Sequence, residues 1–137
     1  MSWIIKSIKW IMLASGVLTS TMIYAAIAPQ AQLRSTFGET LEGPVAEIVV
    51  RNWGALIALI GFMLIYGAFK SESRTLIIVV AGLSKIVFIG LILAYGMKYL
   101  GQQAGLAIAI DSIVVLLFIV YLIAVRGQRS RTDEAAH

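Results

Sequence analysis

Four long apolar segments, separated by short polar stretches, dominate the pattern of hydrophobic and polar positions along the chain. They cover about residues 8–28, 45–69, 75–97 and 104–125. Each holds ~20 residues or slightly more, the length that an α-helix needs to span a hydrocarbon core of ~30 Å. The pattern predicts an all-α polytopic membrane protein, with one four-helix transmembrane bundle over residues 1–125 and a polar tail over 126–137.

The first apolar segment also has features of a secretory signal peptide, because Lys6 and Lys9 precede it and small residues end it at 26–28. Pro29 would then follow the cleavage point directly, which is a poor position for cleavage. We therefore interpret the segment as the first transmembrane helix, with Pro29 as its stop.

Residues 29–43 form the longest polar stretch between two apolar segments. Leu33, Phe37 and Leu41 recur every four residues, which is typical of a short amphipathic helix lying at the membrane interface. A plain loop is the alternative. Pro44 suits the first turn of the next helix, and the two later connections are short enough to make the helices beside them antiparallel neighbours.

The composition agrees with the membrane class, since 60% of the 137 residues are hydrophobic and only 13% are charged. A soluble domain usually carries about 25% charged residues. The chain has no cysteine, so disulfides and thiolate metal sites are excluded. Its one histidine is the last residue, which leaves histidine-ligated haem or zinc almost without ligands. We therefore expect no metal and no cofactor.

Basic residues lie mostly just outside the apolar segments, which is the pattern of membrane topology signals and not of a nucleic-acid surface. Most fall on the side that also holds both termini: Lys6, Lys9, Lys70, Arg74, Arg126, Arg129 and Arg131. Arg34 and Lys98 fall on the opposite side. The positive-inside rule predicts that both termini are cytoplasmic. We expect a bacterial inner membrane protein whose partners include membrane lipid and exclude nucleic acid.

Four ionisable residues lie inside the predicted spans: Glu47, Arg51, Lys85 and Asp111. A lone charge of this kind at the centre of a span costs roughly 2.5–3.5 kcal/mol, so these side chains are expected to face partners or water. At ~1.5 Å per residue they lie between ~3 and ~18 Å from the outer ends of their helices, in one descending column. Glu47 precedes Arg51 by four residues, which is the favourable order for an ion pair on a helix.

Other polar or aromatic residues at similar depths extend the candidate site: Thr19, Asn52 and Trp53. Trp53 either stacks on a ligand or anchors its helix at the membrane interface. Two interpretations of the column of charges stay open. Either it consists of two buried ion pairs, Lys85 with Asp111 and Glu47 with Arg51, that fix the register of the helices, or it lines an outward-facing cavity that holds a polar head group, an ion or a proton.

Small residues form stripes on two of the predicted helices. Gly54, Ala58 and Gly61 share one face of the second helix, which permits close helix approach either inside the bundle or in a homo-oligomer. Gly90 and Ala94 lie on the third helix, away from the column of charges. They are the better candidates for contact with another subunit or with a larger membrane complex.

The run Arg51-Asn52-Trp53-Gly54, the glycine-spaced second helix, the stretch from Gly82 to Lys85 and the four-span length resemble small bacterial DoxX-like membrane proteins. The resemblance covers the general layout and includes no diagnostic motif. It implies a compact four-helix bundle of poorly defined activity. Such proteins often place arginine in the third helix, where this chain has Lys85, so the resemblance transfers no functional residue.

The leading functional hypothesis is a non-enzymatic membrane protein that binds an anionic or amphipathic small molecule or lipid in an outward-facing pocket. Transport of this ligand is an extension of the same hypothesis. Arg51 and Lys85 would hold an anionic group, and Glu47 and Asp111 would balance them in the empty site. The alternative is an accessory or assembly subunit of a larger membrane complex, with purely structural buried charges. A membrane enzyme acting on a lipid would need Asp111 or Glu47 as its acid or base, and the chain carries no catalytic motif that we recognise.

Overall fold

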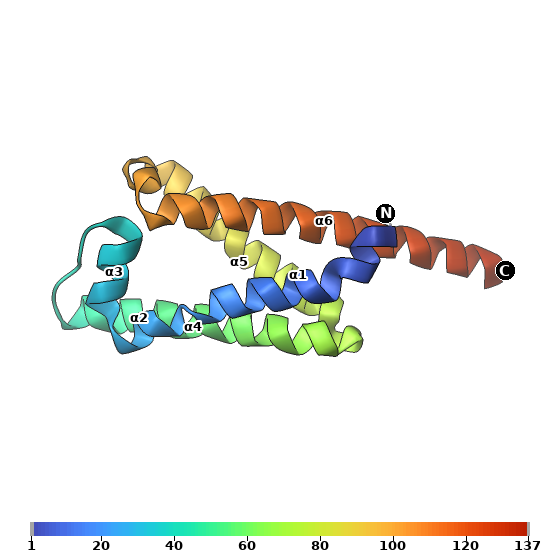
Figure 1. Cartoon of the computed structure of the whole chain (residues 1–137), viewed down its shortest axis with the longest axis horizontal. Coiled ribbons are helices and arrows are strands. Elements are labelled where there is room, and N and C mark those ends of the chain that lie inside the picture. The colour runs from blue at the N-terminus through green and yellow to red at the C-terminus, as the bar shows by residue number, and fades with distance from the viewer. Residues whose placement is uncertain (1, 137) are drawn as a thin grey trace.

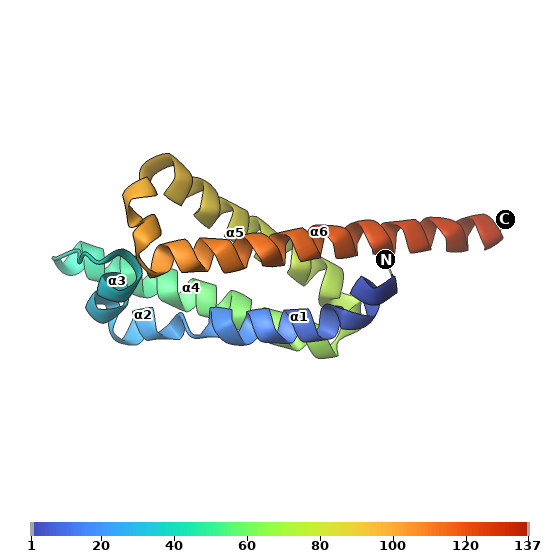
Figure 2. The ribbon, with the colours of Figure 1, turned by 45° about the horizontal axis from the view of Figure 1, so that its top comes forward.

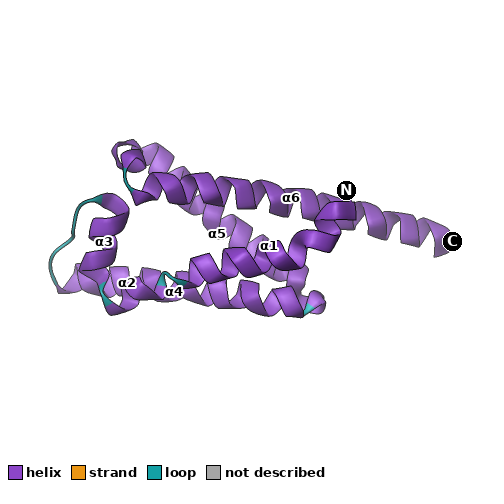
Figure 3. Ribbon diagram, in the orientation of Figure 1, coloured by secondary structure: helices purple, strands orange, loops and turns teal. Residues whose placement is uncertain are grey.

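The computed structural model of the chain describes residues 2–136, and helices make up almost all of this range (Figure 1, Figure 3). Four helical segments are long and apolar enough to cross a membrane: Ser2–Ile27, Pro44–Phe69, Ser71–Tyr95 and Gln103–Arg131. The prediction of an all-α architecture with four candidate membrane spans is therefore confirmed. The elements in chain order are α1 (Ser2–Ser20), α2 (Ile23–Ile27), α3 (Pro29–Phe37), α4 (Pro44–Phe69), the 3₁₀ turn η1 (Ser71–Ser73), α5 (Arg74–Tyr95), the 3₁₀ turn η2 (Met97–Gly101) and α6 (Gln103–Ala136).

The first span begins at Ser2, earlier than its predicted start at residue 8. Ile4, Ile8 and Met12 are spaced four apart and are all fully buried, so the core-facing stripe of α1 extends almost to the N-terminus. The predicted start at residue 8 follows from Lys6 and Lys9. In the structure these two lysines lie within α1, on faces other than the buried stripe.

The first span is also broken, at Thr21 and Met22, into α1 and α2. The amides of both residues donate to carbonyls three residues back, at 3.3 and 3.1 Å, which is the tighter 3₁₀ pattern. The Ser20 hydroxyl donates to the Gly16 carbonyl at 2.7 Å and so competes with the regular backbone ladder. The single helix predicted over residues 8–28 is therefore wrong in this detail.

The stretch after α2 is a helix and not a plain loop. Pro29 occupies the first turn of α3, where its missing amide costs nothing, and the preceding Ala28 leaves the helical conformation. Gly38 ends α3 in the left-handed conformation, at a φ of 75°, and donates to the Arg34 carbonyl. Of the four-residue periodicity, Leu33 is buried as expected, whereas Leu41 lies beyond the helix and is exposed.

Helix α4 matches its predicted range to within one residue, but the two later helices differ at their C-terminal ends. Helix α5 ends at Tyr95, and Gly96 leads into η2. Helix α6 continues through the predicted polar tail to Ala136. No proline follows residue 125, and most of the residues there are good helix formers, so their polarity marks the end of the apolar stretch without ending the helix.

Helices α1 and α2 pack closely along α4 through small residues. A Cβ atom added to Gly61 would lie 2.5 Å from the Ser20 amide nitrogen, and one added to Gly54 would lie 2.5 Å from the Ala25 Cβ. Such distances leave no room for any side chain, because the two backbones are almost in contact. Of the two interpretations of the stripe that includes Ala58, the structure shows the internal-packing one.

The helices of the bundle are packed together at the end near η1 and separate into two groups toward the end near α3. At the end near η1 a continuous apolar core joins α1, α4, α5 and α6, and it includes the fully buried Leu64, Ile78 and Phe118. Toward α3, the pair α1–α2 with α4 lies apart from α5 and α6, and α3 lies across that end (Figure 1, Figure 2). The apolar core therefore fills one end of the bundle and leaves the other end available for a polar site.

Candidate functional site

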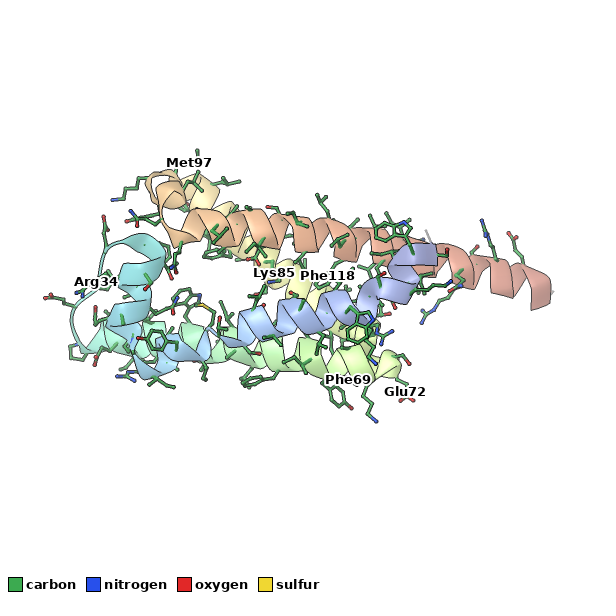
Figure 4. All side chains as sticks on the ribbon, in the orientation of Figure 1. Arg34, Phe69, Glu72, Lys85, Met97 and Phe118 are labelled. Carbon is green, nitrogen blue, oxygen red and sulfur yellow. The ribbon has the colours of Figure 1, made fainter. Side chains whose placement is uncertain are left out.

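Lys85 of α5 lies near the middle of the bundle (Figure 4), where it forms an ion pair with Asp111 of α6. The Lys85 Nζ atom lies 2.8 Å from Asp111 Oδ1, and the two side chains are 9% and 19% exposed. Lys85 also donates to the hydroxyl of Thr19 on α1, at 3.3 Å. Three helices therefore meet at one ammonium group.

The position of the pair follows from the packing around it. Ala81, one turn from Lys85 on α5, and Phe118, two turns from Asp111 on α6, are both fully or almost fully buried in the apolar core. An unpaired charge next to such a core would be strongly unfavourable, and pairing with a hydrogen-bonded opposite charge removes most of that cost. The pair thus forms the polar boundary of the apolar core.

A cavity of about 330 Å³ extends from this ion pair toward α3. Its volume falls within the range of small-molecule sites. Its polar lining residues are Ser15, Thr19, Thr21, Gln32, Thr36, Ser84, Lys85, Gln103 and Asp111. The rest of the lining is mostly apolar and includes Met22, Trp53, Ile57, Ile60, Phe88 and Ile110. The cavity therefore has an ion pair at its floor, hydrogen-bonding groups along its lining and an otherwise apolar wall.

Helix α3 covers the far end of the cavity, and we call it the roof (Pro29–Phe37). Gln32 and Thr36 line the cavity from the roof, and the Gln32 amide donates to the Thr36 hydroxyl at 2.8 Å. Phe37 holds the roof in place by ring contacts with Trp53 on α4, at 6.3 Å between centroids, and with Tyr99 on η2, at 5.2 Å.

A second contact ties the chain just after the roof to η2. The Tyr99 hydroxyl donates to Glu39 Oε2 at 2.8 Å, and Lys98 Nζ lies 3.5 Å from Glu39 Oε1. The hydrogen bond from Tyr99 and the charge of Lys98 lower the pKa of the Glu39 carboxyl below its usual value. The sequence analysis missed this contact. Its only sequence signal is a tyrosine and a lysine beside the end of a span, which topology alone explains.

Glu47 and Arg51, two of the expected site residues, lie outside the cavity. Their side chains are about half exposed, with Arg51 Nη2 4.0 Å from Glu47 Oε1. Arg51 Nη1 donates to the carbonyl oxygens of Ala26 and Ile27, at 2.6 and 3.4 Å. These carbonyls end α2, where the negative end of the helix dipole favours a cation.

The structure contains both ion pairs of the first interpretation, but they lie apart and do not form one column, and the pair of Glu47 with Arg51 is not buried. Glu47, Arg51 and Gly54 do share a face of α4, but that face packs on α1 and α2 and not on the cavity. Asn52 is exposed and does not line the cavity either. Of the expected site residues, the structure brings together in one cavity the following: Thr19, Trp53, Lys85 and Asp111.

The described residues contain no cluster of three or more histidine, cysteine, aspartate or glutamate side chains that could hold a metal ion. The cavity offers a single carboxylate next to an ammonium group, which is an arrangement for hydrogen bonding.

Comparisons of the chain with protein-family models, with curated proteins and with solved structures gave no match in any of the three.

Proposed function

We propose that this protein binds an amphipathic small molecule or lipid in the cavity, with the polar head of the ligand against Lys85 and Asp111. The observation that carries the proposal is a hydrogen-bonded ion pair that forms the floor of a cavity of about 330 Å³. An ion pair with a purely structural role is best served by close packing on all sides, because empty space beside it forfeits packing contacts.

The ion pair retains hydrogen-bonding capacity that a ligand head could use. An ammonium group has three donors, and Lys85 uses two of them, on Asp111 and Thr19. Asp111 accepts from the described residues through Oδ1, which leaves its Oδ2 available. A head group with one acceptor and one donor, such as a hydroxylated or zwitterionic head, would accept the third hydrogen bond of Lys85 and donate one to Asp111 Oδ2.

The charge balance favours a ligand head with no net charge. The expectation of an anionic ligand relied on two cations, Arg51 and Lys85, but Arg51 binds the end of α2 instead. An anion at Lys85 would leave three charges with a net negative sum in a largely apolar surrounding, which is unfavourable. The apolar side chains of the wall, including Ile57, Ile60 and Phe88, would surround the hydrophobic part of the ligand.

A cavity-filling substitution tests the proposal directly. Ala107 lines the cavity, whereas Ala109 on the same helix is exposed and does not. Native mass spectrometry of protein released gently from its own membranes is expected to show a small-molecule adduct that disappears in Ala107→Phe and persists in Ala109→Phe. Retention of the adduct in Ala107→Phe, or no adduct in the unsubstituted protein, would contradict the proposal.

The second candidate function is that of an accessory or assembly subunit of a larger membrane complex. Two observations favour it: Gly90 lies on an exposed face of α5 where an added Cβ would meet nothing, and α6 extends beyond the bundle to Ala136 (Figure 1). In this case Gly90→Leu would release the protein from a complex on native gels, and Asp111→Asn would not. A homo-oligomer would respond in the same way, but at a mass that is a multiple of one chain.

The setting of the protein is part of the proposal. The distribution of lysine and arginine supports two cytoplasmic termini in a bacterial inner membrane, so that the roof faces the opposite side. The DoxX-like resemblance contributes layout only and no residue of the site. Transport of the ligand would need a second conformation that opens the apolar core. We therefore propose binding, and not transport, as the function of the cavity and its ion pair.

A further inference from the structure

The proposed function leaves open the route by which a ligand reaches the ion pair, and the inference below rests on that function. We infer that the occupant is a bilayer lipid that enters sideways from the membrane, through a gap between α1–α2 and α6. Its polar head reaches Lys85 and Asp111, and its hydrocarbon chain stays in the bilayer.

The lining of the cavity contains residues that are also part of the outer surface. On one side these are Leu18, which is 54% exposed, and Thr21; on the other they are Gln103, Leu106, which is 63% exposed, and Ile110. A side chain that belongs both to a cavity and to the surface marks the rim of an opening. We call the gap rimmed by these five residues the portal. Both views of the ribbon show α2 and the first turns of α6 well apart (Figure 1, Figure 2).

The portal lies within candidate membrane spans, which run over Ser2–Ile27 and Gln103–Arg131. Asp111 is only ~12 Å along α6 from Gln103, at ~1.5 Å per residue. A lipid head that starts at the membrane interface would therefore move a short way inward along the cavity, while its chain leaves through the apolar rim. The mostly apolar rim suits a hydrocarbon chain and would exclude a charged, water-soluble molecule.

The roof covers the end of the cavity that lies away from the apolar core. Leu33 and Thr36 of α3 are buried, and Phe37 lies between the rings of Trp53 and Tyr99. The hydrogen bond from Tyr99 to Glu39 fixes the chain that follows the roof. The cavity is therefore covered at its end and open at its side, which is the geometry for a ligand that is dissolved in the membrane.

Cysteine accessibility tests the route without any ligand, because the chain has no native cysteine. Ser84→Cys places a thiol in the cavity, Leu83→Cys places one on the lipid-facing side of the same helix, and Glu42→Cys places one in an exposed loop. The protein would be reconstituted in vesicles of phosphatidylethanolamine and phosphatidylglycerol. Labelling with pyrene maleimide, which dissolves in the bilayer, would be compared with labelling by a sulfonated methanethiosulfonate, which does not.

We expect Ser84→Cys to behave like Leu83→Cys and unlike Glu42→Cys. Relative to the loop variant, its preference for the bilayer-dissolved reagent should be greater by at least about tenfold, because a sulfonate is strongly disfavoured in hydrocarbon. Labelling of Ser84→Cys by the sulfonated reagent at the rate of Glu42→Cys would overturn the inference and assign access from water.

A second measurement separates the route from the proposed function. The double variant Leu18→Trp with Leu106→Trp narrows the portal, and Tyr99→Phe loosens the roof. Native mass spectrometry after reconstitution should show that the portal variant loses its phospholipid adduct and that Tyr99→Phe keeps it. An adduct in both variants would refute the lateral route alone, whereas no adduct in the unsubstituted protein, with bilayer labelling of Ser84→Cys, would refute the binding function and leave the portal in place.

Discussion

The ammonium group of Lys85 and the carboxylate of Asp111 lie 2.8 Å apart across α5 and α6, at the boundary between an apolar core and a cavity. Removing one partner leaves the other as an unpaired charge beside hydrocarbon. Lys85→Met or Asp111→Leu alone is therefore expected to lower the free energy of unfolding by roughly 3 kcal/mol. The double variant should recover most of this loss. Thermal unfolding in detergent measures both effects, and two additive losses would contradict the pairing.

The Thr19 hydroxyl is a smaller part of the same arrangement. Thr19→Val keeps the shape of the side chain and removes the acceptor for Lys85, so we expect a loss of about 1 kcal/mol in stability. Thr21→Val is the matched control, because the Thr21 hydroxyl is exposed and bonds to its own helix at Leu18. Its effect should stay within about 0.5 kcal/mol. Equal effects at the two positions would argue against a bond between Thr19 and Lys85.

The glycines of α4 and α5 should respond in opposite directions to the same change. Gly61→Ala would bring a methyl group to 2.5 Å from the Ser20 amide nitrogen and 2.8 Å from the Gly16 carbonyl oxygen, and we expect a loss of roughly 2–4 kcal/mol because both are backbone atoms. At Gly90 an added Cβ meets nothing, so Gly90→Ala should gain about 0.5–1 kcal/mol from helix propensity. Unfolding monitored by circular dichroism decides the sign of each change.

The contact between Glu39 and Tyr99 predicts that the roof loosens in acid. The folded protein lowers the pKa of Glu39 from its ordinary value of 4.5, so the stabilisation is complete above that pH and is lost as the pH falls through the lowered value. Tyr99→Phe should move the pKa back toward 4.5. The measurement is the fluorescence of Trp53, in a variant with phenylalanine at the other two tryptophans, as the pH is lowered. A midpoint that does not change in Tyr99→Phe would contradict the assignment.

Arg51 is expected to matter for stability and not for binding. Arg51→Met removes the bonds to the carbonyls of Ala26 and Ile27 and the favourable charge at the end of α2, at a cost of about 1 kcal/mol. The small-molecule adduct should persist, in contrast to its expected loss in Ala107→Phe. Loss of the adduct in Arg51→Met without further loss of stability would contradict this prediction and indicate that Arg51 takes part in ligand binding.

Much of the fold was predictable because hydrophobic length is a strong signal in a membrane chain. The pairing of Lys85 with Asp111 was also within reach, since two opposite charges at similar depth have few other partners in hydrocarbon. Arg51 was misplaced for a definite reason. Helical periodicity shows which residues share a face, but not which neighbour that face meets, and here it meets the end of α2.

The break at Thr21 and the roof lay beyond the sequence signal. Ser20 and Thr21 are compatible with an unbroken helix, and the backbone around them is held by the close approach of Gly16 and Gly61 together with the bond from the Ser20 hydroxyl to Gly16. The roof depends on rings at positions 37, 53 and 99, which are brought together by the whole bundle. Contacts between such distant positions carry no local pattern in the chain.

Helix α6 carries Asp111 and continues without interruption to Ala136, well beyond the apolar stretch. At ~1.5 Å per residue, ~27 Å of continuous helix separates Asp111 from Arg129. Any change in the tilt of this helix at the cavity therefore produces a larger displacement at its C-terminal tip. A fluorophore on that tip would therefore report from the water on whether a molecule occupies the space beside Asp111.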